Sequence, residues 1–320
     1  MKLEDIGFYT LSDERALSSS MTSPLYRCEL LLTDRCNFHC PYCRGLQNGG
    51  DLPIAEAKRI LNYWISEGLK NVRFSGGEPT LYKGLPELVR IAKRGGIEHI
   101  AVSTNGSNTA DLYRQLVDYG VNDFSISLDA CCASTADMMA GGSSMWERII
   151  ENIKLLSTIS YVSVGIVLNE INQNETKEIV EMAHYLGVAD IRVIPSAQYN
   201  TRLRLNVVED IVAAHPILRY RLTNNRHVRG LQQKDSPKCK LVLDDMAVWN
   251  GWHYPCIIYL REGGRPIGPV NEQTRQARYD WYISHDSFQD PICRKNCLDV
   301  CIAFNNKAKP NKCIGVGKVY

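Results

Sequence analysis

The sequence lacks the features of a membrane-spanning or exported protein. None of its 320 residues falls in a run approaching the roughly 18 consecutive apolar residues that cross a bilayer. The first residues contain no apolar core of signal-peptide length, and no internal repeat or disordered composition dominates the chain. These absences exclude fibrous and membrane-spanning classes, and we expect a globular protein in the cytoplasm.

Cysteine is abundant, but its most conspicuous cluster lacks a fourth member. The chain has 12 cysteines, and in a cytosolic protein of this length clustered cysteines are more often metal ligands than disulfides. Cys36, Cys40 and Cys43 have the spacing C-x3-C-x2-C and follow an apolar run that predicts a buried strand. A structural zinc ion takes four protein ligands, so three thiolates leave one position of a bound metal centre open to another ligand. The alternatives are a zinc loop or three unrelated cysteines.

Apolar strand runs and amphipathic helical runs alternate over the first 200 residues, which predicts an α/β fold. Polar residues follow several of these strands, so we expect their side chains at the mouth of a barrel. We predict strands at 26–33, 70–75, 98–104, 122–128, 161–168 and 189–194. We predict helices at about 53–67, 84–94, 109–119, 146–158 and 174–187.

The stretch LLLTDRCNFHCPYCRG, residues 30–45, resembles the signature loop of the radical S-adenosylmethionine (SAM) superfamily, including the aromatic Tyr42 before the third cysteine. The resemblance implies a partial (β/α)6 barrel of TIM type, with a [4Fe-4S] cluster on Cys36, Cys40 and Cys43 and SAM on the open iron. It also implies an oxidoreductase, isomerase or synthase that cleaves SAM reductively. The resulting 5′-deoxyadenosyl radical would abstract a hydrogen atom from the substrate. A small donor such as flavodoxin or ferredoxin would supply the electron.

The resemblance extends to the strand ends. The sequence GGEP at residues 76–79 is similar to the motif that binds the SAM amino group, and Glu78 can accept from an ammonium group. For Asn105 and Asp129 the alternative is a turn or helix-cap role, and for Arg192 it is an ion pair with a helix carboxylate. The resemblance implies a SAM pocket formed by Tyr42, Gly76, Gly77, Glu78, Pro79, Thr104, Asn105, Ser127, Asp129, Asn169 and Arg192.

Two adjacent cysteines, Cys131 and Cys132, follow the fourth predicted strand. Thiols at a barrel mouth can donate a hydrogen atom to a substrate radical, as in radical SAM epimerases. We therefore name both as candidate catalytic residues. The alternative is that they are small apolar fillers of a loop.

A second group of cysteines lies near the C-terminus. Cys239 and Cys256 flank an alternating stretch around Asn250-Gly251 that predicts a β-hairpin. The arrangement resembles the SPASM module, or its shorter twitch form, but lacks the C-x2-C-x5-C-x3-C pattern of a full SPASM module. It therefore implies one auxiliary [4Fe-4S] cluster, held by Cys239, Cys256 and two of the remaining candidates, with a four-cysteine zinc site as the alternative. Those candidates are Cys293, Cys297 and Cys301, with Cys313 beyond them.

Charge divides the chain unevenly. Residues 1–200 carry 18 Lys and Arg against 24 Asp and Glu, whereas residues 201–320 carry 19 against 11. The basic C-terminal part favours an anionic substrate, a nucleotide or nucleic-acid component, unless the charges form only a solvated surface. The alternatives are radical modification of a peptide or small metabolite, and an iron–sulfur redox protein without SAM chemistry. The arginines expected to contact phosphates are Arg219, Arg221, Arg226 and Arg229.

These patterns predict four segments. Residues 1–25 form an irregular lead-in, and residues 26–200 form the partial barrel. Residues 201–238 form a basic connecting segment, and residues 239–320 form a small auxiliary-cluster module that contains the hairpin.

Overall fold

The computed structural model describes residues 13–45, 50–142, 144–203, 205–224 and 226–308. Its centre is a nine-stranded sheet in the order β6-β5-β4-β3-β2-β1-β7-β8-β9. Strands β1 to β7 pair in parallel, and β8 and β9 pair antiparallel. The strands are β1 (Arg27–Leu31), β2 (Asn71–Ser75), β3 (His99–Thr104), β4 (Asp123–Ser127), β5 (Tyr161–Leu168), β6 (Asp190–Pro195), β7 (Asp245–Trp249), β8 (Trp252–Tyr254) and β9 (Gly268–Pro269).

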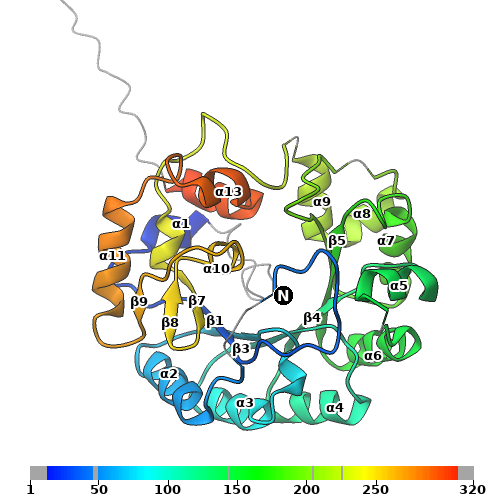
Figure 1. The fold of residues 1–320 in the computed structure, drawn as a ribbon, viewed down its shortest axis with the longest axis horizontal. Coiled ribbons are helices and arrows are strands. Elements are labelled where there is room, and N and C mark those ends of the chain that lie inside the picture. The colour runs from blue at the N-terminus through cyan, green and yellow to red at the C-terminus, as the bar shows by residue number, and fades with distance from the viewer. Residues whose placement is uncertain (1–12, 46–49, 143, 204, 225, 309–320) are drawn as a thin grey trace, which may run out of the picture.

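Helices alternate with the first six strands and follow one another around the outside of the curved sheet (Figure 1). Those that precede β7 are α1 (Asp13–Ser18), α2 (Ile54–Ser66), η3 (Pro79–Leu81), α3 (Leu85–Arg94), α4 (Ala110–Tyr119), α5 (Ala133–Ala140), α6 (Trp146–Ile159), α7 (Thr176–Tyr185), α8 (Glu209–Ala214), α9 (Pro216–Thr223) and η4 (Lys240–Leu243). The others are α10 (Ile257–Arg261), α11 (Thr274–Ser284), α12 (Pro291–Asn296) and α13 (Asp299–Lys307).

The predicted partial barrel of six β/α units is confirmed. All six predicted strands and all five predicted helices are present, most of them within one or two residues of the expected bounds. Strands β6 and β9 stand at opposite ends of the sheet order, so hydrogen bonds do not close the barrel. The carboxyl ends of the parallel strands therefore meet at one partly open mouth.

The hydrophobic core lies between the sheet and the surrounding helices. Side chains alternate along each strand, so Val72 and Phe74 of β2 pack outward against the helices, among them Trp64 of α2. The alternate residue Arg73 faces the barrel interior, where it forms a buried ion pair with Asp123 at 3.0 Å. This alternation places the polar side chains of the strands inside the barrel, beneath its mouth.

The C-terminal part of the chain continues the barrel sheet. The predicted hairpin is confirmed as β7 and β8, with Asn250 and Gly251 in the left-handed region at φ 50° and 80°. Strand β7 pairs in parallel with β1, with Arg27 opposite Asp245. One sheet therefore crosses the boundary that the sequence places at residue 239.

Helices also occur in two segments for which the sequence analysis predicted none. Residues 13–18 form α1, because Ala16 packs against Leu241 and Phe304 of the C-terminal part and Arg15 pairs with Asp244. The basic connecting segment contains α8 and α9. Among the helices of the described residues, none has the length and apolar character needed to cross a membrane.

Candidate functional site

The three cysteines of the first loop lie just beyond β1 and line one cavity of about 270 Å³, called the first cavity here. The N–H of Cys43 donates to the carbonyl of Cys40 at 2.9 Å, and the N–H of Phe38 donates to Cys36 Sγ at 3.4 Å. Burial raises the pKa of Cys40 to about 11, with smaller contributions from Asp129 and the two neighbouring cysteines. The loop therefore gathers three thiols that a bound cation would stabilise as thiolates.

Gly76 and Gly77 follow β2 and pack directly on the cysteine loop. The N–H of Gly77 donates to Thr33 O at 2.7 Å, and the N–H of Glu78 donates to Arg35 O at 2.8 Å. A Cβ at Gly76 would lie 2.4 Å from Thr33 O, and one at Gly77 would lie 2.3 Å from Arg35 O. Only glycine permits this approach, so these two residues fix the loop against the end of β2.

Glu78 is 1% exposed and joins the ends of β2 and β3. Its Oε1 accepts from the hydroxyls of Thr80 and Thr104 at 2.6 and 2.7 Å, and its Oε2 accepts from the N–H of Asn105 at 2.7 Å. Burial raises the pKa of this carboxyl, and these hydrogen bonds oppose that effect. The carboxylate expected to bind an ammonium group is thus engaged within the protein, where it positions the neighbouring strand ends.

Four other predicted pocket residues line the first cavity from β3 and β4: Thr104, Asn105, Ser127 and Asp129. Asn105 Nδ2 donates to Asn37 Oδ1 at 2.9 Å and lies 4.0 Å from Cys36 Sγ. Asp129 accepts from the hydroxyl of Tyr42, which also lines the cavity, and burial raises the pKa of its carboxyl to about 6. The cysteine loop is therefore tied to the ends of both strands.

The structure does not bring three of the predicted pocket residues into the lining of the first cavity. Pro79 begins η3 behind the cavity wall. Asn169 accepts from the N–H of Ile171 at 2.9 Å and so forms a local turn. Arg192 donates to the hydroxyl of Ser125, which lines the cavity, but Arg192 itself does not line it.

The candidate catalytic thiols Cys131 and Cys132 are also absent from the lining of the first cavity. Ala130 and Ala136, on either side of them in sequence, do line it. The loop after β4 therefore keeps both thiols out of the lining of the first cavity.

One residue of this cavity had no recognised signal in the sequence. Arg261, at the end of α10, lines the first cavity, and its Nη2 donates to Gly76 O at 2.6 Å. The next residue, Glu262, forms an ion pair with Arg44 beside the cysteine loop. The place of Arg261 in the cavity depends on the β1–β7 pairing, which no local pattern predicts. In the sequence, its position five residues after Cys256 was the one signal that could have pointed to it.

Comparison with known families identifies this arrangement. Residues 30–183 match the model of the Radical SAM superfamily. These residues form a radical SAM domain. The family uses a [4Fe-4S] cluster together with SAM, and the residues of the first cavity fit both groups. Three thiols follow the end of β1, and Gly76 and Gly77 line the same cavity beside them.

The radical SAM domain is the part that resembles curated relatives. The probable GTP 3′,8-cyclase of Saccharolobus solfataricus is 33% identical over 176 residues, which are 53% of this chain and 57% of that protein. The probable GTP 3′,8-cyclase of Metallosphaera sedula is 28% identical over 180 residues, or 53% of this chain and 56% of that protein. The chain thus spans little more than half the length of these relatives.

Two solved structures share the fold over most of the described chain. Streptococcus suis SuiB bound to SAM has a TM-score of 0.58 at 15% identity, covering 81% of this chain and 66% of that one. The enzyme anSMEcpe with bound SAM has a TM-score of 0.56 at 13% identity, covering 81% and 82%. At these identities the likeness concerns the fold alone.

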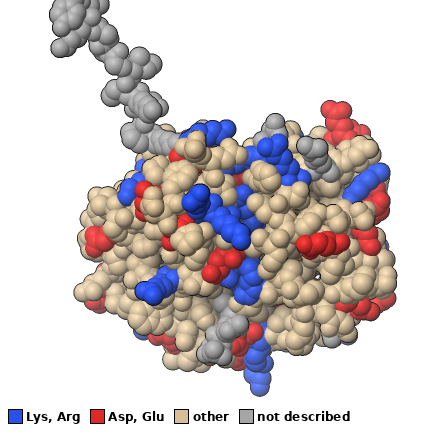
Figure 2. Space-filling view, turned by 45° about the horizontal axis from the view of Figure 1, so that its top comes forward, with Lys and Arg blue, Asp and Glu red and all other residues tan. Residues whose placement is uncertain are grey.

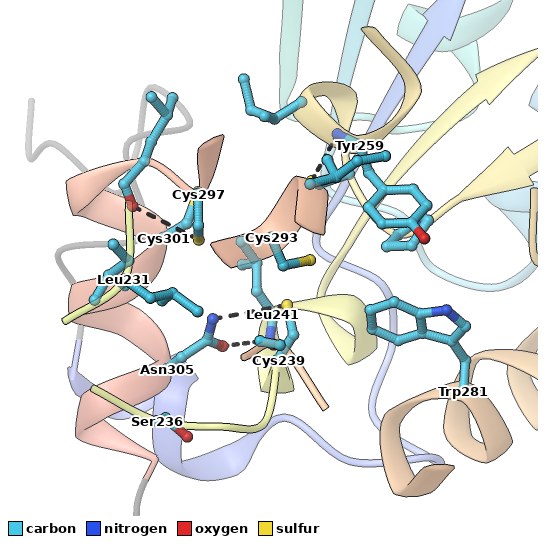
Figure 3. A pocket seen from close by; sticks show the side chains of 17 residues that line it. Leu231, Ser236, Cys239, Leu241, Tyr259, Trp281, Cys293, Cys297, Cys301 and Asn305 are labelled. Carbon is cyan, nitrogen blue, oxygen red and sulfur yellow. Dashed lines mark hydrogen bonds between the residues drawn. The ribbon is translucent and has the colours of Figure 1, made fainter. Parts of the chain in front are cut away.

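A second cavity, of about 30 Å³, lies outside the radical SAM domain and gathers five thiols (Figure 3). Cys239 accepts from Asn305 Nδ2 at 3.6 Å, and Cys256 accepts from the N–H of Tyr259 at 3.4 Å. Cys313 falls outside the described residues. The thiols in the lining are Cys239, Cys256, Cys293, Cys297 and Cys301.

The spacing of these thiols distinguishes a cluster from a single zinc ion. Thiolates on one tetrahedral zinc lie about 3.8 Å apart, since each Zn–S bond is about 2.3 Å. Among the described residues, no three of the five thiols lie within 4.8 Å of one another. Burial, followed by the charges of the other cysteines, raises the pKa of Cys297 and of Cys301. The five thiols are therefore too widely spaced for three of them to share one zinc ion, although Cys293 alone lies within 4.8 Å of ligand atoms of His285 and Asp290.

Proposed function

We propose that this chain is an enzyme that cleaves SAM reductively and uses the resulting radical to abstract a hydrogen atom from a substrate. The observation that carries the proposal is the convergence of Cys36, Cys40 and Cys43 with Gly76 and Gly77 in one cavity at the mouth of the barrel. A chain that only transferred electrons would need the thiols but not a ligand cavity beside them. The first cavity therefore favours SAM chemistry over an iron–sulfur redox protein.

Some residues of the first cavity would hold the cluster, and others position the strand ends that form its wall. The three thiolates would hold a [4Fe-4S] cluster, which together with SAM supplies the electron and the 5′-deoxyadenosyl radical. Glu78 joins the ends of β2 and β3 through two hydrogen bonds, from Thr104 and Asn105, and accepts two more from Thr80. Asn105 is thereby fixed beside Cys36, so the wall of the cavity is organised before any ligand binds.

The proposal is tested with the full chain, reconstituted anaerobically with iron and sulfide. Dithionite and SAM should yield 5′-deoxyadenosine, measured by liquid chromatography and mass spectrometry. The Cys36→Ala/Cys40→Ala/Cys43→Ala variant should yield none. Cys28→Ala is the matched control, because Cys28 is fully buried on β1, the strand before the cysteine loop, and lines neither cavity. Formation of 5′-deoxyadenosine by the triple variant would refute the proposal.

We further propose one auxiliary [4Fe-4S] cluster in the second cavity, held by four of its five thiols. Cys239 and Cys256 are the first two ligands, because they flank the hairpin that docks on β1. The spacing of the thiols and the small apolar cavity support this choice over zinc. Reconstituted protein should then contain about eight irons, two cubane clusters of four.

For the substrate we propose a small anion such as a nucleotide. The support is a group of three arginines: Arg261 lines the first cavity, Arg44 follows Cys43 in the cysteine loop, and the charge of Arg229 interacts with that of Arg44. Burial lowers the pKa of Arg229 to about 10, and the charges of Arg44 and Arg221 lower it further. Burial and Arg261 likewise lower the pKa of Arg44. Glu262 pairs with Arg44 and offsets one of these charges, and the remaining buried cations favour a bound anion. Lys and Arg gather near the centre of the face in Figure 2.

The same geometry argues against a long nucleic acid. Arg221 is 3% exposed and forms an ion pair with Asp299, and Arg226 pairs with Asp235 at 2.9 Å. Two of the four arginines expected to contact phosphates are therefore engaged inside the protein. The name GTP 3′,8-cyclase carried by the curated relatives adds support for a nucleotide, within the matched half of the chain.

Calorimetry with GTP, ATP and UTP at several salt concentrations tests the substrate class. A nucleotide held by one or two arginines should bind with a shallow salt dependence. Arg229→Gln should weaken binding at least about 10-fold, as expected for a lost charged hydrogen bond. Arg219→Gln, an exposed arginine on α9, should not. Absence of binding at low salt would remove the nucleotide and favour a peptide or small metabolite.

Two expectations from the sequence remain proposals. We propose that a small one-electron donor such as flavodoxin or ferredoxin reduces the enzyme. The cytoplasmic location likewise stays a prediction. Reduction of the reconstituted protein by purified flavodoxin, followed by ultraviolet–visible spectroscopy, checks the first.

A further inference from the structure

The loop after β4 brings together two thiols and a carboxylate that neither cavity uses. The thiol of Cys131 donates to Glu175 Oε2 at 3.3 Å. The two sulfur atoms of Cys131 and Cys132 and a carboxylate oxygen of Glu175 all lie within 4.8 Å of one another. All three side chains are partly exposed, so an ion can reach them from solvent.

Neighbouring hydroxyls hold these three groups in place. Thr135 Oγ1 donates to Glu175 Oε1 at 2.6 Å, and Ser134 Oγ lies 3.2 Å from Cys132 Sγ. Outer hydrogen bonds of this kind fix the orientation of metal ligands and keep their lone pairs directed at one point.

We propose that Cys131, Cys132 and Glu175 form a binding site for a thiophilic divalent metal ion, with zinc as the ion that fits best. Two thiolates and one carboxylate oxygen supply three of the four positions of tetrahedral zinc. Soft sulfur ligands exclude magnesium and calcium, which prefer oxygen. Binding displaces the proton that Cys131 shares with Glu175, because a thiol binds such an ion only as a thiolate.

The proposed site is separate from both cluster sites. None of its three residues lines the first or the second cavity. The spacing of the ligand atoms also differs. The ligand atoms of Cys131, Cys132 and Glu175 all lie within 4.8 Å of one another, whereas among the described residues no three sulfur atoms of the cluster cysteines do. A single ion therefore fits here, where a cubane cluster does not.

An ion at this site would immobilise one wall of the first cavity. Glu175 precedes α7, and the two thiols precede α5, so the ion would join the starts of both helices. Helix α5 lines the cavity with Met139 and Ala140. Its last residue accepts from the N–H of His39 in the cysteine loop at 2.9 Å. The metal would thereby restrain the loop that carries the first three cysteines.

The test uses the full-length protein after anaerobic cluster reconstitution and removal of free metal. Zinc is titrated and counted by mass spectrometry of the metal, with iron counted in the same samples. The wild type should take up one zinc per chain without losing iron. Cys132→Ser and Glu175→Gln should each weaken zinc binding at least about 10-fold. Glu178→Gln, an exposed glutamate on the same helix, should bind as the wild type does.

Alkylation keeps the test independent of the stability of the variants. In the wild type, zinc should protect Cys131 and Cys132 from iodoacetamide, as read by peptide mass spectrometry. Equal zinc binding by the wild type and Glu175→Gln would overturn the three-ligand site. Zinc uptake that displaces iron, or that leaves both thiols open to alkylation, would overturn it as well.

Discussion

Gly77 is the position where a single methyl group should most directly disturb the first cavity. A Cβ at this residue would lie 2.3 Å from Arg35 O and 2.7 Å from Asp34 O, both of them backbone atoms of the cysteine loop. No side-chain rotation can relieve a contact with backbone. Gly77→Ala must therefore push the loop, and Cys36 with it, away from the end of β2.

The magnitude follows from the contacts that the displacement breaks. Two backbone hydrogen bonds, Gly77 N–H to Thr33 O and Glu78 N–H to Arg35 O, join the loop to β2. Each contributes about 1 kcal/mol, and the overpacking itself costs about 1–3 kcal/mol. We expect Gly77→Ala to lower the free energy of unfolding by about 3–5 kcal/mol. A misplacement of about 1 Å at a reacting group can reduce the rate about 100-fold.

The assay compares iron content and 5′-deoxyadenosine formation in Gly77→Ala and Gly45→Ala after identical anaerobic reconstitution. Gly45 is the matched control, since it lies two residues after Cys43 and a Cβ there meets no atom within 4 Å. We expect Gly77→Ala to lose most of the iron of the first loop and nearly all SAM cleavage, and Gly45→Ala to keep both. Wild-type values in Gly77→Ala, or an equal loss in Gly45→Ala, would refute the argument from close approach.

Three other changes test separate parts of the structure. Cys239→Ala should remove about four of eight irons and leave the SAM-bound cluster. Unchanged iron in this variant, together with loss of a zinc ion that the wild type binds, would contradict this. In Glu78→Gln, an amide N–H group would face the donors whose hydrogen bonds the carboxylate accepts in the wild type. The free energy of SAM binding, measured by calorimetry, should therefore become about 2 kcal/mol less favourable. Unchanged affinity would remove its positioning role. Burial raises the pKa of Asp190 to about 6, so its folded form retains a proton that the unfolded chain releases. Its contribution to stability is full below the unfolded pKa and is lost as pH rises through the folded pKa. Urea unfolding of the wild type relative to Asp190→Asn should therefore show a loss of about 3 kcal/mol between pH 4 and pH 7. A constant difference would contradict the raised pKa.

The sequence predicted the first six β/α units well because their signals are local. Alternating strand residues and amphipathic helices of about ten residues carry their periodicity within one window. Helix α5 was missed because it has only eight residues and packs beside the cysteine loop, a contact distant in the sequence. The pairing of β7 with β1 joins residues more than 200 positions apart, and no local pattern encodes it.

The site was predicted less evenly than the fold, for a related reason. A motif specifies which residue types gather, as with the three cysteines of the first loop, but not how deep along a strand each side chain lies. Arg192 pairs with Gly165 in the middle of β5, so its side chain reaches Ser125 in the cavity wall and does not line the cavity itself. Asn169 has the residue type of a ligand contact, yet its side chain satisfies its own turn.

The C-terminal part of the chain helps to form the first cavity as well as the second. Cys256, a residue of the second cavity, is the N-cap of helix α10, and the helix ends at Arg261, which donates to Gly76 O in the first cavity. In Figure 1 this helix lies near the centre of the ring formed by the sheet and its helices. A helix of five residues spans about 7.5 Å, so a shift at either cavity is transmitted to the other by a short rigid element. Loss of the metal centre at Cys256 should therefore loosen the backbone at Gly76. The two cysteine sites are expected to stabilise each other although they belong to different parts of the chain.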